Sequence, residues 1–287
     1  METVYQFCKR NIDSIIGFDQ PGFKWKKRYY NDTFKAIEGV KELRDLSDEI
    51  KRSDVLEFFR TENYYQGFLS ALIWGGISTR PSKGHKGDKL TSSAYKVLSL
   101  PKHKIEEIAQ RVKSYIENEE YERAYDLFAV EDKLEGLNVS FFTKILYFIS
   151  ESIDPNSDLK GVNLSLLIYD KWTKVVHLLL LLEVDEKEKI KNYFGENYLN
   201  KFFPNSIDEK ATNLVYCKRE FAFEAYLDYC MRMNSLAKEL SENSHKNIEA
   251  SHLESFLFGL PLKFKNNSVS NNRLVIRSKI KFYVKEG

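Results

Sequence analysis

EGLNVSFFTKILYFISES, residues 135–152, contains one charged side chain between its two outer glutamates, and that side chain is Lys144. The apolar and aromatic residues around it recur at spacings of three and four, which predicts a helix with Ser140 at its N-cap. Residues 121–129 predict an earlier helix, and Gly136 lies in the turn between the two. The stretch therefore predicts two helices joined by a tight hairpin.

A hairpin of this kind turns backbone N–H groups outward near a helix N-terminus, where they can hold a DNA phosphate without reading the base sequence. The pattern also fits an ordinary pair of antiparallel helices. A second candidate for phosphate contacts is GGISTRPSKGHKGDKL, residues 75–90, a glycine-rich basic loop that equally fits a solvated connection. The residues expected to contact the DNA backbone are Lys133, Gly136, Asn138, Ser140, Arg80 and Lys83.

Lys144 lies one turn inside an otherwise apolar helix, where an unpaired ammonium is unfavourable. Two interpretations fit the sequence. The aliphatic stem can extend to the surface and keep the charge in water, or the amine can lie in a cleft where desolvation leaves part of it neutral and nucleophilic. The helix alone does not separate them, so a second group is needed.

That second group is Asp170, in SLLIYDKWTKVVHLLLLLEV, residues 165–184. An apolar run meets a new helix at this aspartate, which predicts that its carboxylate caps the first turn. A carboxylate held at a helix start can also stabilise positive charge on a sugar ring, as cleavage of an N-glycosidic bond requires. Asp170 is therefore predicted to be an N-cap and is a candidate catalytic residue.

The composition is that of a globular protein with a real core, because 43% of the 287 residues are hydrophobic and 14% are aromatic. The 44 basic and 42 acidic residues nearly cancel, so a DNA site would have to be a local patch. Three cysteines without paired spacing fit packing residues in a reducing compartment. With no signal peptide and no apolar run of membrane-spanning length, we expect a cytoplasmic monomer.

Helical periodicity runs through most of the chain, so the predicted fold class is mainly α. The tail, RLVIRSKIKFYVKEG, alternates apolar and basic residues and predicts one or two short β-strands at the C-terminus. The predicted helices are residues 3–16, 33–50, 53–60, 64–75, 90–99, 104–117, 120–129, 140–151, 171–183, 186–203, 208–215, 219–240 and 250–257.

These features together resemble the helix-hairpin-helix DNA glycosylase superfamily, and most closely its branch of 8-oxoguanine glycosylase (OGG)-fold proteins of bacteria and archaea. GLNVSFFTKILYF resembles the hairpin with the catalytic-lysine helix, and LIYD resembles the segment that carries the aspartate. The weaker similarities are YYQGFLSALIWGG with a helix that lines the base pocket, and YLDYCMRMNSLAKEL and LESFLFG with the closing helices.

The resemblance implies two helical lobes around a cleft. It divides the chain into an N-terminal helical region (1–54), a glycosylase core (55–260, with the hairpin at about 121–151) and a C-terminal extension (261–287). The chain departs from the family's hairpin pattern at Glu135, which replaces a proline, and at Asn138, which replaces a glycine. Asparagine can adopt the left-handed backbone conformation of glycine, so we expect Asn138 to preserve the turn.

By the same resemblance, Lys144 would attack C1′ of a flipped nucleotide and Asp170 would stabilise the sugar cation. An amine nucleophile implies a bifunctional enzyme that also nicks the strand. No metal or cofactor is implied, and the five histidines show no metal-ligand spacing; His177 is expected to be a core histidine. Trp74, with Tyr65 and Gln66 earlier in its helix, is the candidate base pocket, although plain core packing also explains these residues.

Three functions stay open at this point. The first is excision of a damaged or modified base from double-stranded DNA, either 8-oxoguanine or, in a defence enzyme, a hypermodified pyrimidine of phage DNA such as a glucosylated hydroxymethylpyrimidine. The second is a non-catalytic helical protein that binds duplex DNA through the hairpin. The third is a helical scaffold with no nucleic-acid partner.

Overall fold

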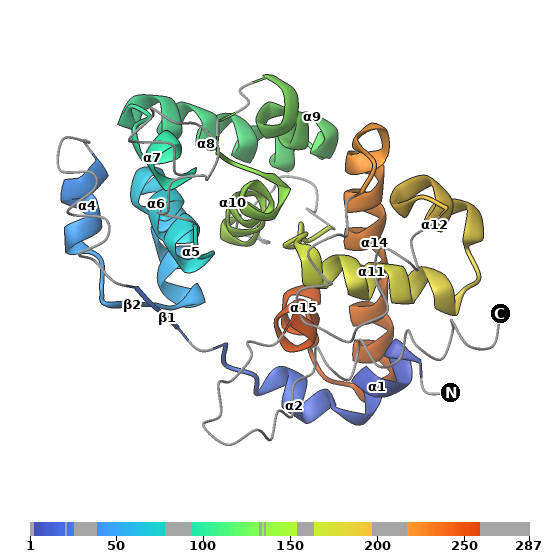
Figure 1. Cartoon of the computed structure of the whole chain (residues 1–287). Helices are drawn as coiled ribbons and strands as arrows, with labels where there is room; N and C mark the ends of the chain where they lie inside the picture. Colours follow the sequence, from blue (N-terminus) through green and yellow to red (C-terminus); the bar gives the residue numbers. More distant parts are fainter. Residues whose placement is uncertain are drawn as a thin grey trace, which may run out of the picture. The chain divides into compact units, whose positions relative to one another are not determined.

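The computed structural model describes residues 3–20, 22–25, 39–77, 93–131, 134, 136–153, 164–196 and 217–258, and they are mainly helical (Figure 1). None of their helices combines the length and apolar character needed to cross a bilayer. The α-helices are α1 (Val4–Arg10), α2 (Ile12–Ile16), α4 (Gly39–Asp45), α5 (Arg52–Arg60), α6 (Tyr64–Trp74), α7 (Ser93–Leu98), α8 (Lys102–Glu117), α9 (Tyr121–Asp126), α10 (Val139–Ser152), α11 (Lys171–Glu183), α12 (Lys187–Phe194), α14 (Ala222–Ser244) and α15 (Ala250–Phe258). The other elements are the π-helical turn η1 (Leu127–Glu131), the 3₁₀ turn η3 (Arg219–Phe221) and strands β1 (Phe23–Lys24) and β2 (Glu49–Ile50).

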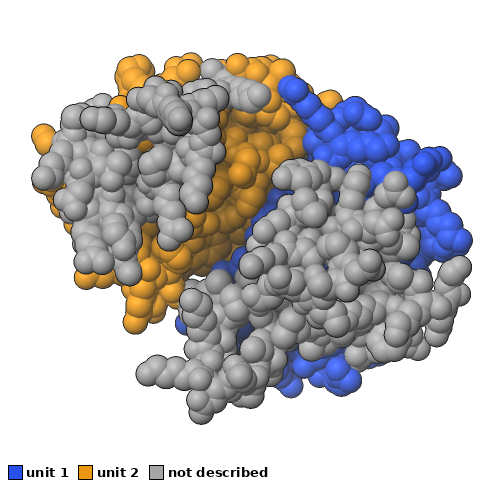
Figure 2. Space-filling view, in the orientation of Figure 1, with its two compact units in different colours: residues 1–20, 169–287 blue, residues 21–168 orange. Residues whose placement is uncertain are grey.

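The chain divides into two compact units, shown in different colours in Figure 2. Unit 1 contains residues 1–20 and 169–287, and unit 2 contains residues 21–168. Unit 1 is therefore built from both ends of the chain. The sequence predicts domain boundaries after residues 54 and 260, which do not coincide with the limits of these two units. That division into domains stays a prediction.

In unit 2, helices α5, α6 and α10 pack together. Ten of the eleven residues of α6 are buried, as expected for a helix that is apolar on every side. The Phe59 ring of α5 stacks on the Phe148 ring of α10 with centroids 6.0 Å apart. Gly67 of α6 allows this, because a Cβ there would lie 2.9 Å from the Phe59 ring. The core of unit 2 thus fixes the position of α10.

In unit 1, both N-terminal helices pack against C-terminal ones. The Val4 N–H of α1 donates a hydrogen bond of 2.6 Å to the Glu183 carboxylate at the end of α11. The Phe256 ring of α15 contacts the rings of Phe7 and Phe18 at centroid distances of 6.1 and 6.0 Å. Residues 3–20 are therefore part of the core that supports α11.

Several predicted helices are shorter in the structure. The helix predicted over residues 3–16 breaks at Asn11 into α1 and α2. The N–H of Asn11 donates a hydrogen bond to the carbonyl of Cys8, three residues earlier, so the α-helical pattern stops there. Within the helix predicted over residues 186–203, α12 ends at Phe194, because Gly195 takes a positive φ of 87°, and residues 197–203 lie outside the described residues.

The strands also differ from the prediction. Of the helix predicted over residues 33–50, residues 33–38 lie outside the described residues and Gly39–Asp45 form α4. Its last two residues instead form β2, which pairs antiparallel with β1. The predicted C-terminal strands and the helix predicted over residues 208–215 lie outside the described residues. A mainly helical fold is thus confirmed, with one small sheet near the N-terminus.

Candidate active site

Lys144 is buried on α10, with 5% of its surface exposed. Its Nζ donates hydrogen bonds to the Ser140 carbonyl at 2.7 Å and to the Ser140 hydroxyl at 3.3 Å, and it lies 5.5 Å from the centroid of the Phe141 ring. The side chain thus folds back toward the start of its own helix, as helical side chains prefer. The amine is held one turn from the helix N-terminus.

The lysine stem packs against the end of α6. A Cβ on Gly75, the C-cap of α6, would lie 2.8 Å from Cδ and 3.0 Å from Cε of Lys144. The preceding residue, Trp74, is 8% exposed and contacts the Phe148 ring edge-on at 5.5 Å. The structure therefore brings the predicted pocket residue Trp74 and the predicted nucleophile into one region of unit 2.

Arg52, the first residue of α5, is a member of this region that the sequence reasoning missed. Its Nε donates a hydrogen bond of 2.8 Å to the Tyr147 hydroxyl, and its guanidinium lies 4.1 Å from the centroid of the Tyr147 ring. It also lies 5.9 Å from the centroid of the Trp74 ring. A cation is thus fixed on the helical turn that follows Lys144. No local pattern indicates it, because the hydrogen bond joins residues 95 positions apart.

The other two predicted pocket residues lie earlier in α6. Tyr65 is 0% exposed, and the Lys102 ammonium lies 5.7 Å from the centroid of its ring. Gln66 is half-buried and accepts a hydrogen bond of 2.9 Å from the Asn63 side chain. Tyr65 is thus part of the unit 2 core, and a role for either residue in base recognition stays a prediction.

The hairpin differs from the prediction in two details. Helix α10 begins at Val139 with Asn138 as its N-cap, so the prediction of Ser140 as the N-cap is wrong. Asn138 has an extended backbone (φ −97°, ψ 172°), whereas Gly136 takes the positive φ of 89°. A Cβ at Gly136 would lie 2.9 Å from the Ser93 carbonyl oxygen, so only glycine fits the turn.

Ser140 therefore accepts a hydrogen bond from Lys144 and does not cap the helix. Asn138 is exposed, while Gly136 and Ser140 are half-buried. The other predicted DNA-backbone residues, Lys133, Arg80 and Lys83, lie outside the described residues. Contact between any of these six residues and DNA stays a prediction.

Asp170 is the N-cap of α11, as predicted, and is 7% exposed. Its Oδ1 accepts hydrogen bonds from the N–H groups of Trp172 at 2.7 Å and Thr173 at 3.2 Å. Its own N–H donates to the Thr173 hydroxyl at 2.8 Å, which completes a capping box. Within the described part of the chain, Oδ2 accepts no hydrogen bond. One carboxylate oxygen therefore caps the helix, and a catalytic role for the other stays a prediction.

Lys174, one turn after Asp170, is a second lysine that the sequence reasoning missed. Burial lowers its pKa, and the nearby Cys217 and Asp170 oppose this shift only in part. Its Nζ lies 5.2 Å from the centroid of the Tyr169 ring. Burial also raises the pKa of Cys217 to about 11, so this thiol stays protonated near neutral pH. Lys174 is the obvious control for any experiment on Lys144.

The two candidate catalytic residues belong to different units, Lys144 to unit 2 and Asp170 to unit 1. A lysine on the second helix of a hairpin and an aspartate at the start of a later helix are the pair expected of a DNA glycosylase of the helix-hairpin-helix class. Residues 17–258 match the family described as "Putative 8-oxoguanine DNA glycosylase OGG-like protein". The match covers most of the chain, and the chain therefore belongs to this family. Comparisons with curated proteins and with solved structures gave no significant match.

Proposed function

We propose that the protein is a DNA glycosylase that turns a modified base out of duplex DNA and excises it, with 8-oxoguanine as the first candidate substrate. Membership of the family supports this class of activity. The observation that carries the assignment to residues is the setting of Lys144, a buried amine held near the start of the second hairpin helix by Ser140.

In the proposed reaction, the amine of Lys144 loses a proton and attacks C1′ of the flipped nucleotide. The bond between C1′ and the base breaks, and its electron pair leaves with the base, which takes up the proton that the amine releases. The negative charge of Asp170 stabilises the positive charge that develops on the sugar. This use of Asp170 is compatible with its capping role, because the cap occupies only Oδ1.

An amine nucleophile also supports a lyase step. The sugar attached to Lys144 opens to a Schiff base, and loss of a proton from C2′ then expels the 3′ phosphate by β-elimination. The Schiff base contains a C=N bond that borohydride reduces to a stable secondary amine. A covalent protein–DNA product would therefore report the proposed chemistry directly.

The test is borohydride trapping on duplexes that carry one modified base each. The panel contains 8-oxoguanine, glucosylated hydroxymethylcytosine, an abasic site and an unmodified control. We expect a covalent product on the abasic duplex and on one modified base, and the identity of that base separates repair of oxidised guanine from attack on modified phage DNA. Binding to every duplex without trapping or base release would instead indicate a non-catalytic DNA-binding protein.

Two matched variants assign the nucleophile. Lys144→Gln should abolish trapping and excision but leave duplex binding within about twofold, because it removes the amine and not the hairpin N–H groups. Lys174→Gln removes the half-buried amine of α11 and should retain the covalent product. Trapping that persists in Lys144→Gln and disappears in Lys174→Gln would instead identify Lys174 of α11 as the nucleophile.

A further inference from the structure

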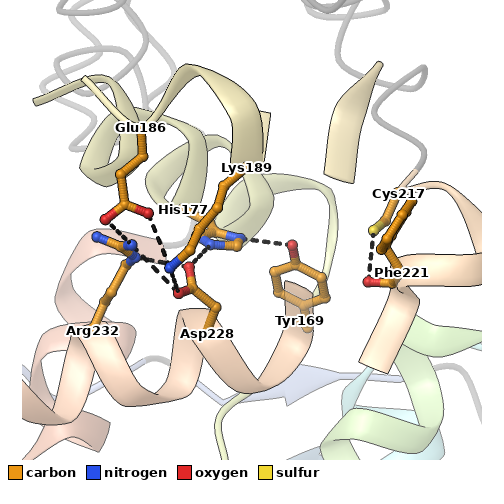
Figure 3. A network of polar contacts seen from close by, with 8 residues as sticks. All are labelled: Tyr169, His177, Glu186, Lys189, Cys217, Phe221, Asp228 and Arg232. Atoms are coloured by element: carbon orange, nitrogen blue, oxygen red, sulfur yellow. Dashed lines mark hydrogen bonds and ion pairs between the residues drawn. The ribbon is translucent and has the colours of Figure 1, made fainter. Parts of the chain in front are cut away.

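Two linked hydrogen bonds, the first buried and the second part-buried, lead away from the residue that precedes Asp170 (Figure 3). The Tyr169 hydroxyl lies 2.9 Å from Nδ1 of His177, and Nε2 of His177 lies 2.8 Å from Oδ2 of Asp228. His177 is on α11 and is 0% exposed, as expected of a core histidine, and Asp228 is on α14. The chain thus ties the residue before the Asp170 cap to two helices.

The direction of these hydrogen bonds follows from the chemistry of the groups. Hydrogen bonds from His177, Arg232 and Lys189 lower the pKa of Asp228 against the opposing effect of burial, so its carboxylate is ionised and only accepts. Nε2 of His177 therefore carries the hydrogen. Burial lowers the pKa of His177, so its Nδ1 is an acceptor at neutral pH and the Tyr169 hydroxyl donates to it.

The far end of the chain is fixed by further charges (Figure 3). Asp228 accepts hydrogen bonds from Lys189 of α12 at 2.9 Å and from Nε of Arg232 at 2.7 Å. Arg232 also donates to the Glu186 carboxylate at 2.7 Å. Helices α11, α12 and α14 are therefore joined at Asp228, so this end of the hydrogen-bond chain is held by three helices.

The near end restrains the approach to the cap. The Tyr169 ring packs against the rings of Tyr229 and Tyr226 at centroid distances of 5.3 and 5.8 Å. Asp170 is bound to the first turn of α11 through its own capping bonds, whereas Tyr169 is bound to His177, about two turns further along the same helix. Adjacent Cα atoms are only about 3.8 Å apart, so fixing Tyr169 restricts the backbone and the carboxylate of Asp170.

We propose that the Tyr169–His177–Asp228 chain is a positioning device that sets the direction of the Asp170 carboxylate, an inference that rests on the proposed function of Asp170. Packing of the ring alone would not need the hydroxyl, and its removal leaves the buried Nδ1 of His177 without a donor, which lowers stability rather than the rate per folded molecule. A positioning role needs the hydroxyl, because a displacement of about 1 Å at a reacting group can lower a rate on the order of 100-fold.

The test is Tyr169→Phe, which removes one hydroxyl and keeps the ring. Excision is followed in single turnover, with enzyme in excess over a duplex carrying the panel base that gives the strongest trapping. We expect the rate to fall roughly 10- to 100-fold, while the dissociation constant for the same duplex and the folded fraction change less than twofold. Tyr226→Phe is the matched control, because it removes a hydroxyl from the same aromatic cluster that is not part of the Tyr169–His177–Asp228 hydrogen-bond chain. This variant should excise the base at the wild-type rate.

A Tyr169→Phe rate that equals the wild type, or that falls only with the folded fraction, would overturn the inference. Equal rate losses in Tyr169→Phe and Tyr226→Phe would also overturn it, since they would indicate a general packing effect. Failure of the proposed function has a different signature, in which Lys144→Gln and Asp170→Asn still excise the base. Loss of excision in those two variants with full activity in Tyr169→Phe rejects only the positioning role.

Discussion

Replacing Gly75 by alanine tests whether the close packing of α6 against Lys144 places the amine. The new methyl group would lie 2.8 Å from Cδ and 3.0 Å from Cε of Lys144. Carbon atoms pack at roughly 3.5 to 4.0 Å, so the lysine stem must retreat by about 0.7 to 1.2 Å. A shift of this size at a nucleophile should slow excision by roughly 10- to 100-fold.

The same variant should change stability little. Gly75 has helical dihedral angles (φ −70°, ψ −7°), so alanine is allowed there and reduces the entropy of the unfolded chain by about 0.4 to 1 kcal/mol. Overpacking typically costs about 1 to 3 kcal/mol. The cost here should fall at the low end, because the two closest atoms belong to a flexible side chain and the third, the Ala71 carbonyl oxygen, is 3.1 Å away. We therefore expect a free energy of unfolding within about 1 kcal/mol of the wild type.

Gly67→Ala is the matched control on the same helix. Its methyl group would lie 2.9 Å from the Phe59 ring, which is stacked on Phe148 and cannot retreat. It should lose about 1 to 3 kcal/mol of stability and keep its excision rate per folded molecule. Urea unfolding and single-turnover excision on the duplex identified by trapping measure both quantities. A Gly75→Ala enzyme with the wild-type rate, or with a loss that matches its unfolded fraction, would refute the reasoning.

Three further predictions follow from the site. Asp170→Asn retains a capping oxygen and should melt within a few degrees of the wild type, yet excise orders of magnitude more slowly because the charge is gone; a wild-type rate would remove Asp170 from the chemistry. The lowered pKa values of His177 and Asp228 mean that the unfolded chain takes up their protons first. Stability should therefore fall as pH drops below about 6.5, and again below about 4, and urea midpoints that are equal at pH 7 and pH 5 would contradict this. Gly136→Ala puts a side chain at φ 89° and should cost at least about 1 to 2 kcal/mol in urea unfolding. Asn138→Ala should not show this loss, because Asn138 has an extended backbone and its side chain makes no capping hydrogen bond.

The sequence predicts the features of this site that depend on neighbours along the chain. The helix around Lys144 follows from its apolar period, and the cap at Asp170 follows from an aspartate at the start of a helical pattern. The N-cap error at Ser140 has a local cause as well. Asn138 and Ser140 are both good capping residues two positions apart, and only the backbone angles distinguish them.

The remaining features depend on contacts between residues far apart in the sequence. His177 and Asp228 are 51 positions apart, so no periodicity or motif could pair them. The close approach of Gly75 to Lys144 is equally invisible, because a glycine at the end of a helix already has a sufficient explanation as a helix stop. Burial of His177 was predictable from the leucines around it, but its partners were not.

Unit 1 contains residues from both ends of the chain, which affects the order in which the protein folds during synthesis. Domains generally fold as units from the N-terminal side as the chain emerges. Unit 2 is complete once residue 168 has left the ribosome, so α10 and Lys144 can reach their folded positions while much of the chain is still being made. Residues 3–20 must wait, because their partner Phe256 lies near the end of the described chain. By this order the proposed nucleophile Lys144 reaches its folded position first, and the helices around Asp170 are complete only when α2 packs against α15.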